Sequence, residues 1–74
     1  MDIRRQVGAN VQRYRKEAEL SQEELAFDCK LHRTYISGVE RGVRNPTVIV
    51  LAKIAGALKV TPAALLEAPE KRRK

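Results

Sequence analysis

The sequence predicts an all-α fold, a compact bundle of five short helices. Apolar residues recur at helical spacing in successive segments, and helix start and stop signals separate these segments by short loops. No stretch has the alternating pattern of a strand. A chain of 74 residues has room for one domain. We expect the domain to span residues 1–68 and to be followed by a basic, disordered tail at 69–74.

The first helix is expected over residues 2–18. Its apolar residues advance in steps of three and four, as one face of a helix does. Asp2 suits the positive N-terminal end of the helix dipole. Gly8 is a poor helix former, so we expect another helix to pack closely against it. The apolar stripe consists of Ile3, Val7, Val11, Tyr14 and Ala18.

Residues 21–42 contain two short helices separated by a tight turn, which is the helix-turn-helix pattern. Ser21 followed by Glu24 is a capping box, and it starts the first of these helices. The buried face of this helix is narrow and consists of Leu25, Ala26 and Cys29. Because Cys29 is the only cysteine, an intrachain disulfide is excluded, and we expect a small buried side chain.

The second helix of the pair begins near Arg33, buries Ile36 and Val39, and stops at Gly42. Its opposite face carries hydrogen-bond donors and no acidic group. Arginine suits the guanine edge, and threonine can meet a thymine methyl group. We interpret this face as one that reads bases in the DNA major groove, with an ordinary solvated polar face as the alternative. The face consists of Arg33, Thr34, Tyr35 and Ser37.

Two further helices are expected over residues 48–58 and 62–67, starting at the N-caps Thr47 and Thr61. The first should bury Leu51, Ala52, Ile54, Ala55 and Leu58. Its start is apolar nearly all round because of Val48, Ile49 and Val50, so it should be fully buried or meet a partner. For Ile49 and Val50 the alternatives are extra core and a homodimer surface. We favour the homodimer surface. The apolar residues of the last helix are Leu65 and Leu66.

Positive charge is distributed unevenly. Of the net +6, four charges lie in the run 71–74, so residues 1–70 carry only +2. Residues 30–44 hold four basic residues against the single acid Glu40, whereas the preceding helix is acidic. This local contrast indicates an oriented positive face for nucleic acid better than the total charge does.

The residues argue against catalysis and against a membrane protein. His32 is the only histidine and has no evident acidic orienter, so no catalytic set can be assembled with it. There is no glycine-rich phosphate loop and no cluster of metal ligands. We therefore expect no enzyme, no metal and no cofactor. The absence of a signal peptide or an apolar run of membrane-spanning length predicts a cytoplasmic protein.

Three segments carry a family resemblance: LSQEELA at 20–26, RTYISGVERG at 33–42 and NPT at 45–47. The sequence resembles the Cro/repressor-type helix-turn-helix family, also called the xenobiotic response element family, over about residues 3–67. RTYISG makes it similar to the controller proteins of restriction–modification systems. The resemblance implies a lambda-repressor-like five-helix bundle that binds double-stranded DNA as a symmetric dimer, without a small-molecule ligand.

The resemblance also implies roles for individual residues. The implied base contacts are Arg33, Thr34 and Ser37. The implied phosphate or backbone contacts are Gln22, His32, Tyr35, Arg44 and Asn45. Arg15 and Glu40 match a structural ion pair that orients the base-reading helix. Lys30 and Lys59 replace the family's glycines, which predicts positive φ angles at both. Gly38 leaves empty a position that can contact bases.

These features predict a sequence-specific transcriptional regulator bound to a short inverted-repeat, palindromic operator as a homodimer. The homodimer interface is expected at Ile49, Val50, Leu65 and Leu66. The alternative is an antitoxin or adaptor-type protein-interaction module on the same fold. In that case Phe27, Ile49, Val50 and the basic run 71–74 would matter more than Arg33 and Thr34.

Overall fold

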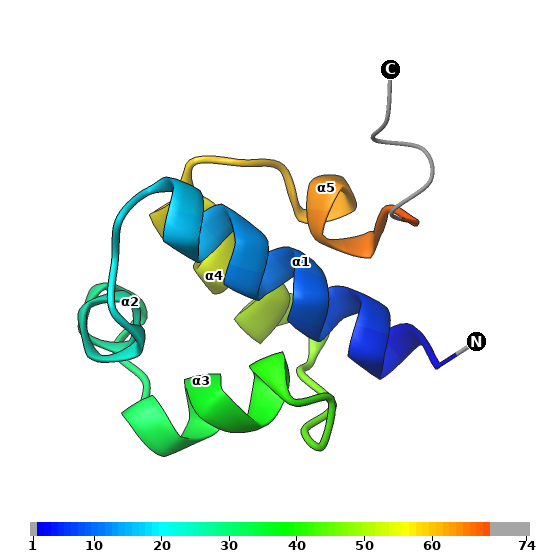
Figure 1. The fold of residues 1–74 in the computed structure, drawn as a ribbon, viewed down its shortest axis with the longest axis horizontal. Coiled ribbons are helices and arrows are strands. Elements are labelled where there is room, and N and C mark those ends of the chain that lie inside the picture. Colours follow the sequence, from blue (N-terminus) through cyan, green and yellow to red (C-terminus); the bar gives the residue numbers. More distant parts are fainter. Residues whose placement is uncertain (1, 69–74) are drawn as a thin grey trace.

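The computed structural model describes residues 2–68, which fold into five α-helices and contain no strand. The expected all-α fold is confirmed. Helix α1 crosses the middle of the molecule, with α3 along one side of it and α5 along the other, while α4 lies behind α1 (Figure 1). The proposed tail at 69–74 lies outside the described residues. The helices are α1 (Ile3–Glu17), α2 (Gln22–Cys29), α3 (Arg33–Glu40), α4 (Val48–Leu58) and α5 (Pro62–Leu66).

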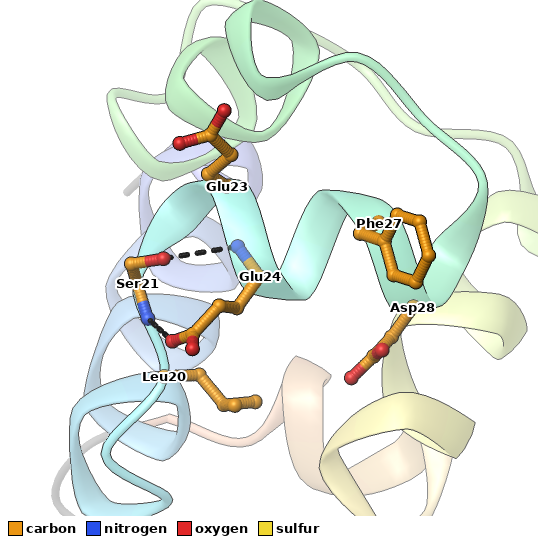
Figure 2. A pocket seen from close by; sticks show the side chains of 6 residues that line it. All are labelled: Leu20, Ser21, Glu23, Glu24, Phe27 and Asp28. Atoms are coloured by element: carbon orange, nitrogen blue, oxygen red, sulfur yellow. Dashed lines mark hydrogen bonds between the residues drawn. The ribbon is translucent and has the colours of Figure 1, made fainter.

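Four of the five helices begin at a side chain that caps the backbone. Asp2, Ser21, Thr47 and Thr61 each accept a hydrogen bond from a backbone N–H in the first turn. In α2 the capping box is complete, because the Ser21 N–H also donates to Glu24 Oε1 over 2.8 Å (Figure 2). The sequence signals for these starts were therefore correct.

Three chain reversals use left-handed backbone at residues other than glycine. Lys30 and Lys59 have φ angles of 62° at the ends of α2 and α4, as predicted. Glu19 adopts the same conformation, with φ of 61°, between α1 and α2, which no sequence pattern had predicted. Each such residue costs about 1–2 kcal/mol of backbone strain. The end of α3 uses Gly42 instead, with φ of 80°, where glycine is unstrained.

All five helices contribute to the core, which is aliphatic as expected. Its largest fully buried apolar side chains are Val11, Leu25, Ile36, Val39, Ile54 and Leu65. Ile3 and Ala18 were expected in the α1 stripe but are exposed, since they lie at the two ends of the helix. Ala52 was expected in the core of α4 but is also exposed. Leu51, Ile54, Ala55 and Leu58 form a complete stripe, and Ala52 lies about 100° around the helix from Leu51.

Close approach of α1 to α3 depends on Gly8. A methyl group on Gly8 would lie 2.7 Å from the Glu40 carbonyl oxygen and closer still to that of Val39. The expected close packing at this glycine is thus present. Any side chain at this position would push α1 away from the C-terminal end of α3.

Helix α5 is held against α1 by a buried amide. Asn10 is 2% exposed, and its Nδ2 donates to the carbonyl oxygens of Leu65, over 2.9 Å, and Glu67, over 2.8 Å. These bonds satisfy carbonyls at the end of α5 that have no partner within the helix. The sequence pattern had not singled out Asn10.

Candidate nucleic-acid interface

Helix α3 presents its polar residues to solvent and its apolar residues to the core. Arg33 and Thr34 are exposed, Tyr35 and Ser37 are half-buried, and Ile36 is fully buried. The helix starts at His32, which is exposed and has N-cap geometry, but its side chain makes no capping hydrogen bond. The predicted base-contact residues therefore lie together on one accessible face of a short helix.

The end of α3 is fixed to α1 by a buried ion pair. Arg15 Nε donates to Glu40 Oε2 over 2.6 Å, and Arg15 Nη2 donates to Glu40 Oε1 over 3.1 Å. The two side chains are only 10% and 2% exposed. The hydrogen bond to Glu40 raises the pKa of Arg15 above its usual value. Arg15 Nη1 also donates to the Leu20 carbonyl over 2.8 Å, so one guanidinium connects α1, α3 and the turn before α2.

Gln22 extends this network toward the exposed face of α3. Its Nε2 donates to Glu40 Oε1 over 2.9 Å, and its Oε1 accepts from Arg33 Nη1 over 3.5 Å. The Gln22 amide, predicted to contact phosphate, is thus engaged within the protein at both ends. Its position links the buried ion pair to the predicted base-contact arginine.

The loop after α3 crosses back over the helix. The backbone N–H groups of Val43 and Arg44 both donate to the Gly38 carbonyl, over 3.0 and 3.2 Å. The Arg44 guanidinium lies 5.6 Å from the centre of the Tyr35 ring. Gly38, expected to leave an empty position on the DNA-facing side, is buried, since the Arg44 side chain lies over it. Arg44 and Asn45 themselves are exposed.

The sequence profile of the helix-turn-helix family matches residues 11–65, the segment from the middle of α1 to α5. This chain belongs to the helix-turn-helix family. The match includes α2, α3 and the turn between them, which carry the surface described above.

Named proteins and solved structures are similar to this helix-turn-helix protein. The control protein C.BamHI of Bacillus amyloliquefaciens is 48% identical over 67 residues, covering 89% of this chain and 83% of that protein. The restriction–modification controller protein C.AhdI of Aeromonas hydrophila superposes with a TM-score of 0.82 at 40% identity, covering 84% of this chain and 94% of that one. The biofilm regulator SinR, solved in complex with DNA, has a TM-score of 0.79 at 34% identity, covering 82% of this chain and 98% of that one.

These similarities confirm the predicted family and the predicted likeness to restriction–modification controller proteins. The similar proteins are control proteins and transcriptional regulators, which confirms that this helix-turn-helix protein is not an enzyme. Within residues 2–68, no helix is long and apolar enough to cross a bilayer. The same residues contain no group of side chains arranged to hold a metal ion.

The helix-turn-helix protein exposes apolar side chains at the start of α4 and at the end of α5. Val48 is 82% exposed, Ile49 is 72% exposed and Leu66 is 45% exposed. Val50 is half-buried. Leu65, predicted to lie in a dimer interface, is fully buried in the core of the single chain, so its side chain cannot meet a partner. A two-leucine pattern at the end of a short helix does not reveal which leucine points inward. Val48 was noted at the apolar start of its helix but was not included in the predicted dimer interface.

Another exposed apolar side chain lies on α2. Phe27 is 82% exposed and borders an open hollow of about 620 Å³ beside Leu20 (Figure 2). The phenylalanine ring and the Asp28 carboxylate both extend from the C-terminal half of α2 in this view. The remaining residues around the hollow are polar or acidic: Ser21, Glu23 and Glu24.

Proposed function

We propose that this helix-turn-helix protein regulates transcription by binding an inverted-repeat operator as a homodimer, with α3 of each copy in the major groove. That this chain is a DNA-binding transcriptional regulator follows from its family and from its similarity to control proteins and to SinR. The operator symmetry, the homodimer and the residue roles are the proposal.

The observation that carries the proposal is the face of α3. Arg33 and Thr34 are exposed beside the half-buried Ser37, and none of the three is acidic. The buried pair of Arg15 with Glu40 fixes the C-terminal end of this helix against α1. A short helix with a fixed orientation and accessible donors suits recognition of base edges in a groove.

Contacts with phosphates would set the position of the protein on the duplex. The exposed side chains of His32, Arg44 and Asn45 border the reading face, and Tyr35 lies beneath Arg44. In the complex, Gln22 Nε2, which gives one N–H to Glu40, would donate its other N–H to a phosphate oxygen. The weak 3.5 Å bond that Gln22 Oε1 accepts from Arg33 would be released. Arg33 would then be free to meet a guanine edge.

The homodimer would form through Val48, Ile49, Val50 and Leu66. Large apolar side chains exposed at the start of α4 and on α5 favour burial against a second copy. A twofold axis at this surface would place the two α3 helices in successive major grooves, about 34 Å apart. A palindromic site is the DNA sequence that such a pair would read.

Selection of bound duplexes from a random pool tests the operator. Enrichment of an inverted repeat whose half-sites are one helical turn apart is the expected result. Recovery of no preferred sequence, or of an asymmetric one, would contradict the proposal. The selected duplex then serves for the measurements on single residues.

Arg33→Ala tests base reading on that duplex. Loss of a bidentate guanine contact should weaken cognate binding by about 1–3 kcal/mol and relax selectivity at one base pair in each half-site. Titration of cognate and scrambled duplexes by fluorescence anisotropy measures both effects. An equal loss on the two duplexes would assign Arg33 to a phosphate contact and contradict its base-reading role.

The exposed phenylalanine favours a second candidate, an antitoxin or adaptor module that binds another protein. Phe27 is 82% exposed on α2 and takes no part in the proposed DNA surface. The random-pool selection separates the two functions, because an interaction module would enrich no operator.

A further inference from the structure

We propose that Gly38 is a positioning residue for DNA binding. Because Gly38 has no side chain, the Arg44 side chain can pack over it, and we call this space the seat. The seat holds Arg44 against Tyr35, in place for a contact with a DNA phosphate. The inference rests on the proposed function, which assigns Arg44 to the DNA backbone. It adds a role for a glycine that offers no side chain to DNA.

The shape of the seat follows from the space above Gly38. A methyl group there would lie 2.6 Å from Arg44 Cγ, 3.4 Å from Nε and 3.5 Å from Cδ. Most of the arginine side chain therefore runs directly over this glycine. A contact of 2.6 Å is too short for two carbon atoms, so alanine would displace the Arg44 side chain.

The loop after α3 cannot easily move to relieve this clash, because hydrogen bonds to the Gly38 carbonyl hold its backbone in place. The Gly38 carbonyl accepts from the N–H groups of Val43 and Arg44, over 3.0 and 3.2 Å. These bonds hold the Arg44 backbone close to α3. Because Cγ is only two bonds from the backbone, relief of the clash requires a different χ1 rotamer for Arg44, and that rotation moves its guanidinium away from Tyr35.

The seated guanidinium lies beside an aromatic ring and, within the described residues, not beside a carboxylate. It lies 5.6 Å from the centre of the Tyr35 ring, and no carboxylate within residues 2–68 is within ion-pair distance of it. Fixing a flexible arginine before binding reduces the entropy lost when it contacts an anion. An exposed cation that packs over Gly38 and beside Tyr35, at the edge of the reading face, is suited to a DNA phosphate.

Gly38 lies inside helix α3, where glycine is an unfavourable residue. In a helix interior, glycine makes the helix less stable than alanine does. A glycine at residue 38 therefore needs another reason to be present, and the need to leave space for Arg44 supplies one. Gly56 of α4 is the matched control for stability, since a methyl group there would meet nothing within 4 Å. We expect Gly56→Ala to raise the melting temperature, and Gly38→Ala to raise it or leave it unchanged.

The test is a double-mutant cycle on a short synthetic duplex of arbitrary sequence, because a phosphate contact is independent of base sequence. Arg44→Ala should weaken binding roughly tenfold and reduce the salt slope by about one. Gly38→Ala should weaken binding by roughly three- to tenfold. In the Arg44→Ala background, Gly38→Ala should have no further effect. An unchanged affinity for Gly38→Ala, or a loss that persists without Arg44, would overturn the inference.

Measurement on the free protein separates this inference from the proposed function. Nuclear Overhauser contacts between the Arg44 side chain and the Tyr35 ring should be present in the unsubstituted chain and lost in Gly38→Ala. Retention of these contacts in Gly38→Ala would overturn the seat, whatever happens with DNA. An unsubstituted chain that binds no duplex would instead contradict the proposed function.

Discussion

The ion pair between Arg15 and Glu40 is the most constrained interaction of the interface. Two charges were removed from water to make it, and their attraction must offset that cost. The five hydrogen-bonding N–H groups of a guanidinium allow Arg15 to satisfy Glu40 and the Leu20 carbonyl at once. This pair holds the C-terminal end of α3, so its loss should disturb both stability and the reading face.

Glu40→Ala should lower the free energy of unfolding by about 3–5 kcal/mol, because it leaves a buried guanidinium without its carboxylate. Urea denaturation measures the loss. Glu17→Ala is the control, since it breaks the exposed pair with Arg13 and should cost less than about 0.5 kcal/mol. Equal losses for the two variants would show that burial adds nothing to the Arg15–Glu40 pair.

Cys29 should be unreactive while the domain is folded. Burial raises the pKa of its thiol, and the neighbouring Asp28 carboxylate acts in the same direction. Since the unfolded thiol ionises at lower pH than the folded one, the thiol favours unfolding as pH rises above about 8.5. Iodoacetamide should modify Cys29 slowly at pH 7 and much faster in urea. Rapid labelling in both states would contradict the buried position.

Single residues differed in how well the sequence predicted them. Gly8 was identified because glycine is conspicuous in a helix, and its close contact with α3 followed directly. Asn10 was missed because its partners lie 55 and 57 residues away, and no local pattern signals a polar contact of that range. The residues of the Arg15–Glu40 pair came only from family resemblance, since 25 residues separate them.

At the level of helices, local capping chemistry determined what could be predicted. Ser21, Thr47 and Thr61 are recognisable N-caps because each acts on a backbone group within three residues of itself. The left-handed Glu19 was not foreseen, since glutamate is common in turns and helices alike. Ala52 was misplaced because a helix of small apolar residues has no clear polar side.

Helix α3 begins without a side-chain cap, so it should be possible to stabilise it. His32→Ser should raise the free energy of unfolding by roughly 0.5–2 kcal/mol, because a serine hydroxyl can accept a backbone N–H of the first turn. Thermal and urea unfolding measure the gain. His32→Ala, which removes the imidazole but cannot cap, is the control. Equal stability of the serine and alanine variants would mean that the N–H groups are already satisfied.

For the whole molecule, the sequence predicted the arrangement of helices better than it predicted the surfaces available to other molecules. Five helices, their order and the helix-turn-helix pair follow from periodicity and caps. The apolar residues that remain exposed are determined by how the five helices pack together. Leu65 is buried only because α5 packs on α1 and α4, and Val48 is exposed only because nothing covers the start of α4.

Self-association should depend on α4 and not on α2. Ile49→Glu should shift sedimentation toward the monomer and weaken operator binding, because it places a charge in the proposed dimer surface. Phe27→Glu is the control, since Phe27 is at least as exposed but lies on another helix. Analytical ultracentrifugation distinguishes the two. A dimer that survives Ile49→Glu would exclude that surface, and one broken by Phe27→Glu would place the contact on α2.

The Asn10 amide and the buried Leu65 have a consequence for how the protein is made. A ribosome that has synthesised only residues 1–60 holds a nascent chain in which the Asn10 amide has neither of its carbonyl acceptors. The core also lacks Leu65, one of its largest fully buried side chains. The domain therefore has to complete its folding after α5 emerges, and until then the newly made helices expose the apolar surface that Leu65 covers in the complete fold.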